Sequence, residues 1–369
     1  MFVKYTDKER RFSRMNDRIE IIRKHLVDNN LDVFLVLSNE NRRYLTGFTG
    51  SNGIVLISKN NCFLMTDSRY TEQAEKEAQA FEIITYNLSP FEDIGVMLKK
   101  WGLNRVGYES KLVTDFQIRQ FKKLDTRYEW IPTEDVVLEL RSIKTKEEIA
   151  CIKKAAEIGD QSFSEMIKTM KAGMTERDLM VELEYRMRKN GSEGSPFSII
   201  VASGKRSSLP HGLASTKRIE KGDMVTIDFG ATWNGYMSDM TRTIWVGEPE
   251  KRMQDIFKMV DEAMVTALGS IEIGKACKEI DEAHRNIFRE YGVEPYSLRG
   301  LGHGVGLQIH EFPRVVMHNE ALLEANMVFT IEPGLYIPDV GGVRTEDTVV
   351  LTESGVISLM KTPKKIVVE

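Results

Sequence analysis

Two aspartates, Asp228 and Asp239, lie eleven residues apart in the segment TIDFGATWNGYMSDMTRT and could act on one chemical centre. The Asn-Gly pair at 234–235 lies between two β-prone runs, which predicts a type I′ hairpin turn with Trp233 opposite Tyr236. In that register the two aspartates are diagonal neighbours on one face, roughly 7–8 Å apart between their backbones. Because like charges on one face repel, either solvent or a cation must separate them.

Two glutamates and a histidine farther along the chain could join this pair. Glu332 ends the apolar run MVFTIE, and Glu346 follows Arg344 by two residues in GGVRTEDTVVL, so the latter two share a face of an extended strand. His303 and His310 lie in GLGHGVGLQIHEFP, where glycines allow the backbone to approach a ligand closely. Each of these residues alone is more often solvated or structural, and only their combination predicts a site.

The combination carries too much negative charge to be buried by itself. Asp228, Asp239, Glu332 and Glu346 each lie in apolar, strand-like sequence, and an isolated buried carboxylate costs many kcal/mol. Two divalent cations would supply the matching charge, and four carboxylates with one imidazole suit Mn²⁺, Co²⁺, Fe²⁺ or Zn²⁺. Bridging carboxylates would hold such ions roughly 3.5–4 Å apart and lower the pKa of a shared water, as in two-metal hydrolases.

The length, composition and net charge of the chain are those of an ordinary globular protein. Its 369 residues predict two domains, and its 41% hydrophobic and 29% charged residues are typical of folded proteins. A net charge of −4 argues against binding to nucleic acid or to a membrane surface. No apolar run reaches the roughly 18 residues of a membrane span, and the basic N-terminus lacks the apolar core of a secretory signal.

The three cysteines predict a reducing compartment. Cys62, Cys151 and Cys277 are odd in number and scattered, without zinc-type spacing or a disulfide framework. We therefore expect a cytoplasmic protein.

Residues 1–140 are expected to form an α/β domain. Apolar strand-like runs alternate there with amphipathic helical runs. The expected strands are 31–38, 53–58, 62–67 and 82–87, and the expected helices are 17–29, 71–80, 91–101 and 114–124. The glycine-bearing loop 46–53 lacks the ending of a phosphate loop and precedes a strand, so it is expected to be a turn.

A second domain is expected over residues 141–369. Thr145 and Glu148 form a capping box that opens a long helix to about Met170. Glycines bracket helical segments at 173–191 and again at 274–292, which indicates an internal repeat with an offset of 101 residues, although chance similarity of amphipathic helices would also explain it. Two such halves would place their strands in one shared sheet flanked by helices, with a cleft at their junction.

The order of the motifs resembles a known family. Over residues 145–369 the chain is similar to the pita-bread metallopeptidases of the Xaa-Pro dipeptidase and aminopeptidase P group, through PHG, TIDFG, SDMTRT, GHGVGLQIHE, TIEPG and VRTED. The first 140 residues resemble the family's N-terminal domain, notably in NRRYLTGFTGSNG and FLMTDSRYTEQA. The resemblance implies an α/β N-terminal domain and an α+β pita-bread catalytic domain with pseudo-twofold symmetry.

The resemblance also implies a two-metal centre. Asp239 and Glu346 would bridge two divalent ions, with manganese expected first and cobalt, zinc or iron as alternatives. The full implied ligand set is Asp228, Asp239, His303, Glu332 and Glu346.

Further residues match catalytic positions of that family. His310 would contact the substrate near the scissile bond, and His211, in LPHG, would steady the tetrahedral intermediate. Arg344 would order the site, and Glu332 would transfer a proton. Family members commonly carry histidine four residues before the first metal histidine, where this chain has Arg299. Since arginine does not release its proton near neutral pH, we expect Arg299 to pair with a substrate carboxylate and to favour dipeptides.

The expected activity is hydrolysis of the Xaa-Pro bond at the N-terminus of dipeptides or short peptides, by a homodimer. Methionine aminopeptidases share the ligands but usually lack the N-terminal domain. Creatinase-like amidinohydrolases share both domains but do not keep the metal carboxylates. A peptide- or histone-binding module on the same fold is the non-catalytic alternative, but such relatives usually lose metal ligands and this chain keeps them all.

Overall fold

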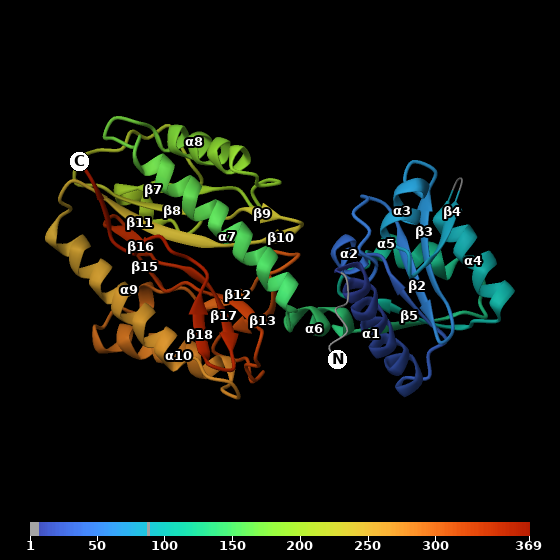
Figure 1. The fold of residues 1–369 in the computed structure, drawn as a ribbon. Coiled ribbons are helices and arrows are strands. Elements are labelled where there is room, and N and C mark those ends of the chain that lie inside the picture. Colours follow the sequence, from blue (N-terminus) through green and yellow to red (C-terminus); the bar gives the residue numbers. More distant parts are fainter. Residues whose placement is uncertain (1–6, 87–88) are drawn as a thin grey trace, which may run out of the picture. The chain divides into compact units, whose positions relative to one another are not determined.

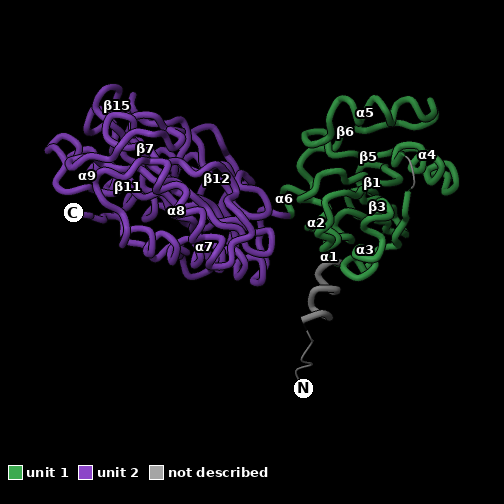
Figure 2. The backbone as a smooth tube through the Cα atoms, turned by 90° about the horizontal axis from the view of Figure 1, so that it is seen from above, with its two compact units in different colours: residues 1–140 green, residues 141–369 purple. Residues whose placement is uncertain are grey.

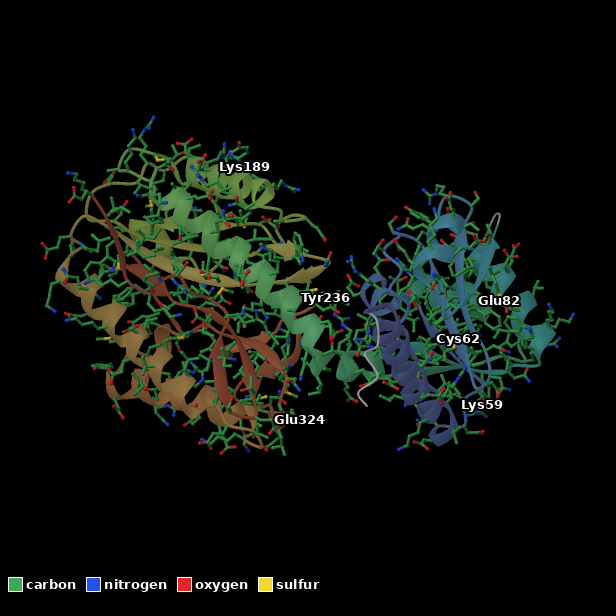
Figure 3. The ribbon with its side chains drawn as sticks, in the orientation of Figure 1. Lys59, Cys62, Glu82, Lys189, Tyr236 and Glu324 are labelled. Carbon is green, nitrogen blue, oxygen red and sulfur yellow. The ribbon has the colours of Figure 1, made fainter. Side chains whose placement is uncertain are left out.

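The computed structural model describes residues 7–86 and 89–369, with side chains from residue 16 onward. The chain divides into two compact units, residues 1–140 and 141–369 (Figure 2). Charged side chains such as Lys59 and Glu82 are exposed on the first unit, and Lys189 is exposed on the second (Figure 3). No helix within the described residues is long and apolar enough to cross a membrane.

The first unit is built on a six-stranded mixed sheet with the order β4-β3-β2-β1-β5-β6 (Figure 1). The strands are β1 (Val33–Val36), β2 (Ile54–Ser58), β3 (Cys62–Asp67), β4 (Glu82–Tyr86), β5 (Arg105–Glu109) and β6 (Glu129–Thr133). The helices are α1 (Asp7–Asp28), α2 (Asn39–Thr46), α3 (Thr71–Glu77), α4 (Pro90–Trp101) and α5 (Asp115–Lys122). Every residue of β1 is buried, because helices cover both faces of the sheet. On one face Val33 and Leu35 pack in a cluster with Leu98 of α4 and Phe121 of α5.

The expected strands and helices of this unit are present, although residue 87 of the strand expected over 82–87 lies outside the described residues. The elements α2, β5 and β6 were not predicted. The strand β6 reads EWIPT, and Pro132 cannot donate to a ladder, so the sequence argues against a strand there. The structure places β6 at the edge of the sheet, where a proline is tolerated. The loop after α2 leads into β2 at Ile54, as expected.

The second unit contains two matching helix pairs. After α6 (Val136–Ser142), which spans the boundary between the units, come α7 (Lys146–Ile167), α8 (Glu176–Lys189), α9 (Lys251–Ser270) and α10 (Cys277–Glu290). The Thr145–Glu148 capping box opens α7 as predicted, although α7 ends at Ile167 and not at Met170. The bounds of α8 and α10 differ by the predicted 101 residues at both ends. The repeat in the sequence is therefore a repeat of helices.

The strands of the two halves do not form one shared sheet, and this expectation was wrong. One sheet has the order β19-β11-β8-β7, another has the order β13-β12-β14-β17-β18, and β10-β9 and β15-β16 are two-stranded. At the junction, the Thr243 hydroxyl donates to the Arg344 carbonyl oxygen at 2.9 Å and accepts from its N–H at 3.2 Å. The backbone N–H and carbonyl oxygen of Arg344 are therefore bonded to a side chain. They do not bond to the backbone of the strand that carries Thr243, so they do not join the two sheets.

The strands of the second unit are divided between its two halves. The first half holds β7 (Ile200–Ser203), β8 (Met224–Phe229), β9 (Thr232–Trp233), β10 (Tyr236–Met237) and β11 (Met240–Val246), with the 3-10 helix η1 (Gly204–Ser208). The second holds η2 (Glu294–Tyr296), β12 (Gly302–Gly304), β13 (Glu311–Val315), β14 (Val328–Ile331), β15 (Gly334–Ile337), β16 (Gly341–Arg344), β17 (Asp347–Thr352), β18 (Gly355–Ser358) and β19 (Ile366–Val368).

The hairpin that carries the two aspartates has the predicted register. Trp233 pairs with Tyr236, and Asp228 pairs with Thr241. Asn234 and Gly235 have φ of 48° and 72°, as the two central residues of a type I′ turn require. The Asn-Gly turn therefore fixes which face of the sheet the aspartates occupy.

Gly230 in this hairpin is expected to tolerate no side chain. A Cβ there would overlap the carbonyl oxygen of Ser238 and lie 2.8 Å from Pro196 Cγ, whereas a Cβ on Gly269 of α9 would meet nothing within 4 Å. We expect Gly230→Ala to lower the free energy of unfolding by about 1–3 kcal/mol or more through overpacking. Gly269→Ala should raise it by about 0.5–1 kcal/mol, because alanine loses less entropy in a helix. Urea unfolding of both variants measures this, and equal behaviour of the two would contradict it.

Candidate metal centre

Five side chains from separate strand ends converge in the second unit. Asp228 lies in β8, Asp239 just before β11, His303 in β12, Glu332 just after β14, and Glu346 between β16 and β17. Asp239, His303 and Glu346 each offer one ligand atom, and these atoms lie within 4.8 Å of one another. His303 Nε2 is 3.4 Å from Glu332 Oε1 and 3.6 Å from Asp239 Oδ2. Three of the five predicted ligands thus lie around a common point, and Glu332 adjoins them through His303.

Asp228 is connected to the other acids through the guanidinium of Arg344. Its Oδ2 accepts from Arg344 Nη2 at 2.6 Å, and its charge raises the pKa of Asp239, Glu332 and Glu346. Arg344 also donates to the Thr241 hydroxyl at 3.1 Å. One guanidinium therefore faces four carboxylates, which leaves most of their charge without a counterion.

Two carboxylate oxygens in this group are buried acceptors. Asp228 Oδ1 and Asp239 Oδ1 are buried and accept no hydrogen bond within the described part of the chain. A buried acceptor without a partner is costly. Divalent cations would satisfy both oxygens and compensate the charge, and the set of carboxylates with one imidazole suits such ions. The residues present therefore fit a metal centre.

The carboxylates hold protons strongly when no cation is near. Burial, followed by the charge of the neighbouring acids, raises the pKa of Asp239 and of Glu346 well above the usual range. Burial raises the pKa of Glu332 to about 7, with Arg344 opposing the shift and Asp228 adding to it. Metal binding here must displace protons, so it is expected to be pH-dependent.

His303 is prepared to act as a neutral ligand. Burial, and next the nearby His310, lower its pKa to about 3, so the ring is uncharged near neutral pH. Its Nδ1 lies 3.1 Å from the carbonyl oxygen of Gly304. The proton therefore belongs on Nδ1, and the lone pair of Nε2 points to the acids.

Threonines support the acids, and the sequence analysis did not identify them. The Thr241 hydroxyl donates to Glu346 Oε2 at 2.7 Å, and the Thr330 hydroxyl donates to Glu332 Oε1 at 3.2 Å. The Thr348 hydroxyl accepts from Asp239 N at 3.1 Å and donates to Asp239 O at 2.8 Å. Each threonine lies two residues from one of the candidate ligands along extended chain. That spacing places both side chains on one face and was the available signal.

The predicted catalytic residues differ in how the structure places them. His310 packs edge-on against His303, with ring centroids 4.2 Å apart, and its pKa is lowered by burial first and by Arg314 and His211 next. His211 is exposed, and the carbonyl oxygen of its neighbour Pro210 accepts from Arg344 at 3.0 Å. Arg344 therefore connects the loop of His211 to Asp228.

Arg299 does not contact the candidate metal ligands. It is exposed on the segment before β12 and makes no hydrogen bond or ion pair with any residue that the structure describes. Its cationic group is available to a ligand, but its predicted role rests on the sequence.

The chain is similar to known proteins over both of its units. The model of metallopeptidase family M24 matches residues 150–353, and that of the creatinase/prolidase N-terminal domain matches residues 18–143. The chain is 39% identical to an Xaa-Pro dipeptidase of Pyrococcus furiosus over 353 residues, which are 95% of this chain and 100% of the relative. A solved Xaa-Pro dipeptidase from Bacillus anthracis is 40% identical with a TM-score of 0.93, covering 96% of this chain and all of that one. A solved X-Pro aminopeptidase from Thermotoga maritima is 38% identical with a TM-score of 0.86, covering 92% and 98%.

Proposed function

The chain belongs to metallopeptidase family M24, and from that premise we propose that it hydrolyses the Xaa-Pro bond at the N-terminus of dipeptides and short peptides. It is a metallo-exopeptidase of the Xaa-Pro dipeptidase and aminopeptidase P type. The observation that carries the proposal is the convergence of Asp239, His303 and Glu346 beside buried carboxylate oxygens that accept no hydrogen bond from any described residue.

We propose that five side chains hold two divalent ions, with manganese as the physiological metal. Asp239 and Glu346 would bridge the ions, as the resemblance to the family implies. Both side chains are buried, and burial first and the neighbouring acids next raise the pKa of each. Such ions, when bound, polarise a carbonyl and activate water at neutral pH. The full proposed ligand set is Asp228, Asp239, His303, Glu332 and Glu346.

Three residues around that centre, Glu332, His310 and His211, have proposed roles in catalysis. Glu332 lies 3.4 Å from His303 Nε2, and its carboxylate would accept a proton and pass it to the leaving amine. His310 stays neutral near pH 7 because burial lowers its pKa, so it donates a hydrogen bond to the substrate without adding charge. His211 approaches the same substrate from the exposed loop, which Arg344 anchors through Pro210.

The proposal is tested by activity on a set of peptides. Protein stripped with a chelator is reloaded separately with Mn²⁺, Co²⁺ or Zn²⁺ and offered an Xaa-Pro dipeptide, an Xaa-Pro tripeptide and a Met-Ala peptide. We expect cleavage of the Xaa-Pro substrates, two ions per chain by elemental analysis, and no activity of the stripped protein. Preference for the Met-Ala peptide would favour methionine aminopeptidase activity instead, and an inactive, metal-free chain would favour a binding module.

Arg299 is proposed to set the preferred peptide length. Its exposed guanidinium can pair with the C-terminal carboxylate of a dipeptide, which a longer peptide places elsewhere. Arg299→His should therefore raise KM for the dipeptide more than for the tripeptide, and equal changes would remove this role. The homodimer expected from the resemblance is part of the same proposal, and light scattering of the metal-loaded protein measures it.

A further inference from the structure

Arg242 is a completely buried arginine next to the candidate metal centre, with 0% of its surface exposed. It lies in β11 between Thr241 and Thr243, whose hydroxyls bond to Glu346 and to the backbone of Arg344. Since neighbouring residues of a strand point to opposite faces, Arg242 points away from the acids. It is therefore not a ligand or a substrate contact, and a charge buried at such a place requires another explanation.

One side of the Arg242 guanidinium fixes the backbone that carries Glu346. Its Nη1 donates to the carbonyl oxygens of Thr241, at 2.9 Å, and of Glu346, at 2.5 Å. The same two residues are joined by a hydrogen bond from Glu346 N to Thr241 O, at 3.1 Å, and by the bond from the Thr241 hydroxyl to Glu346 Oε2. Arg242 thus fixes the crossing of the two sheets at the residue proposed to bridge the metals.

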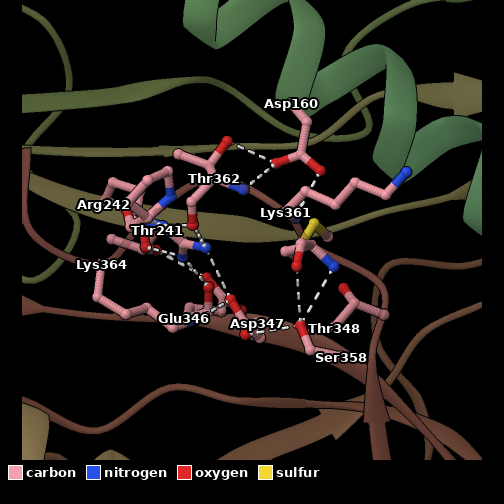
Figure 4. Close-up of polar contacts among 12 residues, drawn as sticks. Asp160, Thr241, Arg242, Glu346, Asp347, Thr348, Ser358, Lys361, Thr362 and Lys364 are labelled. Atoms are coloured by element: carbon pink, nitrogen blue, oxygen red, sulfur yellow. Dashed lines mark hydrogen bonds and ion pairs between the residues drawn. The ribbon is translucent and has the colours of Figure 1, made fainter.

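The other side of the guanidinium is held by the segment 359–364, here called the C-terminal strap. Nε donates to the carbonyl oxygens of Thr362 and Pro363 at 3.2 and 3.1 Å, and Nη2 donates to Thr362 O at 2.8 Å. Nη2 also donates to Asp347 Oδ1 at 2.8 Å, and Lys364 forms an ion pair with the same oxygen (Figure 4). All five N–H donors of Arg242 are thereby used.

A second buried acid fixes the strap to helix α7. Asp160 is 8% exposed and accepts from Lys361 N at 2.8 Å, from Thr362 N at 2.9 Å and from the Thr362 hydroxyl at 2.5 Å (Figure 4). These bonds turn the Thr362 carbonyl oxygen toward Arg242. A continuous chain of hydrogen bonds therefore leads from α7 through the strap and Arg242 to Glu346.

We propose that Arg242 is a positioning residue for the metal ligand Glu346 and that the C-terminal strap, anchored by Asp160, holds Arg242 in place. The inference rests on the proposed two-metal function. The geometry requires arginine, because lysine carries the charge but lacks the planar fork that reaches carbonyls on both sides. Loss of such a supporting partner typically weakens metal affinity or activity by about 10–100-fold.

The test compares three variants of the full chain. Arg242→Lys keeps the charge and removes the fork, and Asp160→Asn weakens the anchor of the strap. Asp178→Asn is the control for the chemical change: Asp178 is exposed and also accepts a backbone N–H, from Thr175 at the start of α8, but does not contact the strap. The readouts are Mn²⁺ affinity by calorimetry of chelator-treated protein, the visible spectrum of the Co²⁺-loaded protein, and kcat and KM on an Xaa-Pro dipeptide.

We expect Arg242→Lys to weaken Mn²⁺ binding at one site by about 10–100-fold, to change the Co²⁺ spectrum and to lower kcat with little change in KM. Asp160→Asn should change the same quantities in the same direction by less, and Asp178→Asn should change none. Wild-type affinity and spectrum in Arg242→Lys would overturn the inference. If that variant does not fold, Asp160→Asn decides: equality with Asp178→Asn overturns it, and weaker metal binding supports it. A wild-type protein that binds no metal would instead contradict the proposed function.

Discussion

Asp239→Asn is expected to lower kcat/KM for an Xaa-Pro dipeptide on the order of 10³-fold, because the centre loses several kcal/mol of charge stabilisation in the transition state. Asp239 offers a ligand atom to the cluster with His303 and Glu346, and its Oδ1 has no hydrogen-bond partner in the part of the chain that the structure describes. An amide at this position can supply neither the charge nor a bridge between two cations. We therefore expect the variant to bind one equivalent of Mn²⁺ or less, as measured by elemental analysis after dialysis.

The control makes the same chemical change at a buried acid elsewhere. Asp281 of α10 is 0% exposed and accepts from Arg285 Nε at 2.7 Å, but it has no contact with the cluster. Asp281→Asn alters a buried ion pair whose arginine also donates to Leu298 O and lies 3.7 Å from Glu294, so metal content and kcat/KM should stay at the wild-type level. Equal losses of activity in the two variants would show that the Asp239 effect is general destabilisation.

Glu332→Gln is expected to stabilise the metal-free protein at pH 8 although it abolishes activity. Burial raises the pKa of Glu332 from its usual 4.5 to about 7, so ionising it in the folded state costs more than in the unfolded chain. The unfolded chain loses this proton first, so stability falls as pH rises from about 4.5 to 7. The full loss above pH 7 amounts to about 3 kcal/mol, which a neutral glutamine avoids.

Thermal unfolding with chelator present at pH 5 and pH 8 measures this effect. At pH 8 the variant should melt roughly 6–12 °C above the wild-type protein, given about 2–4 °C per kcal/mol for a unit of this size. At pH 5 the difference should be small, because the folded wild-type protein still holds the Glu332 proton. Comparison with wild type at each pH cancels the contribution of His303, whose pKa is lowered to about 3. With Mn²⁺ bound the order should reverse, and a variant that is less stable than wild type at pH 8 without metal would contradict the charge argument.

Local sequence determined the parts of the site that depend on neighbours along the chain. The Asn-Gly pair at 234–235 requires positive φ at both residues, so it fixed the hairpin register and with it the shared face of Asp228 and Asp239. The capping box of Thr145 likewise opened α7 as predicted. Charge also follows from sequence alone, since four acids in apolar runs need cations wherever they meet.

Long-range pairing decided the rest, because nothing local specifies it. In the sequence Arg242 is only the arginine of SDMTRT, and its partners Thr362 and Glu346 lie more than a hundred residues away. The same holds for Glu311, whose neighbours along the chain do not indicate a partner. Buried in the fold, it pairs with Arg141 and lies 3.5 Å from Lys144 Nζ.

The split of the strands into separate sheets was decided in the same way. A hydroxyl of Thr243 that bonds the backbone of Arg344 ends a ladder only because the two segments cross at that point. The periodicity of a strand predicts on which face of the sheet a side chain lies. It does not predict which side chains from distant segments are buried against that face. The sequence therefore determined the chemistry that the site needs, and only the tertiary structure decided which distant groups support it, because those contacts form when two halves of the chain pack together.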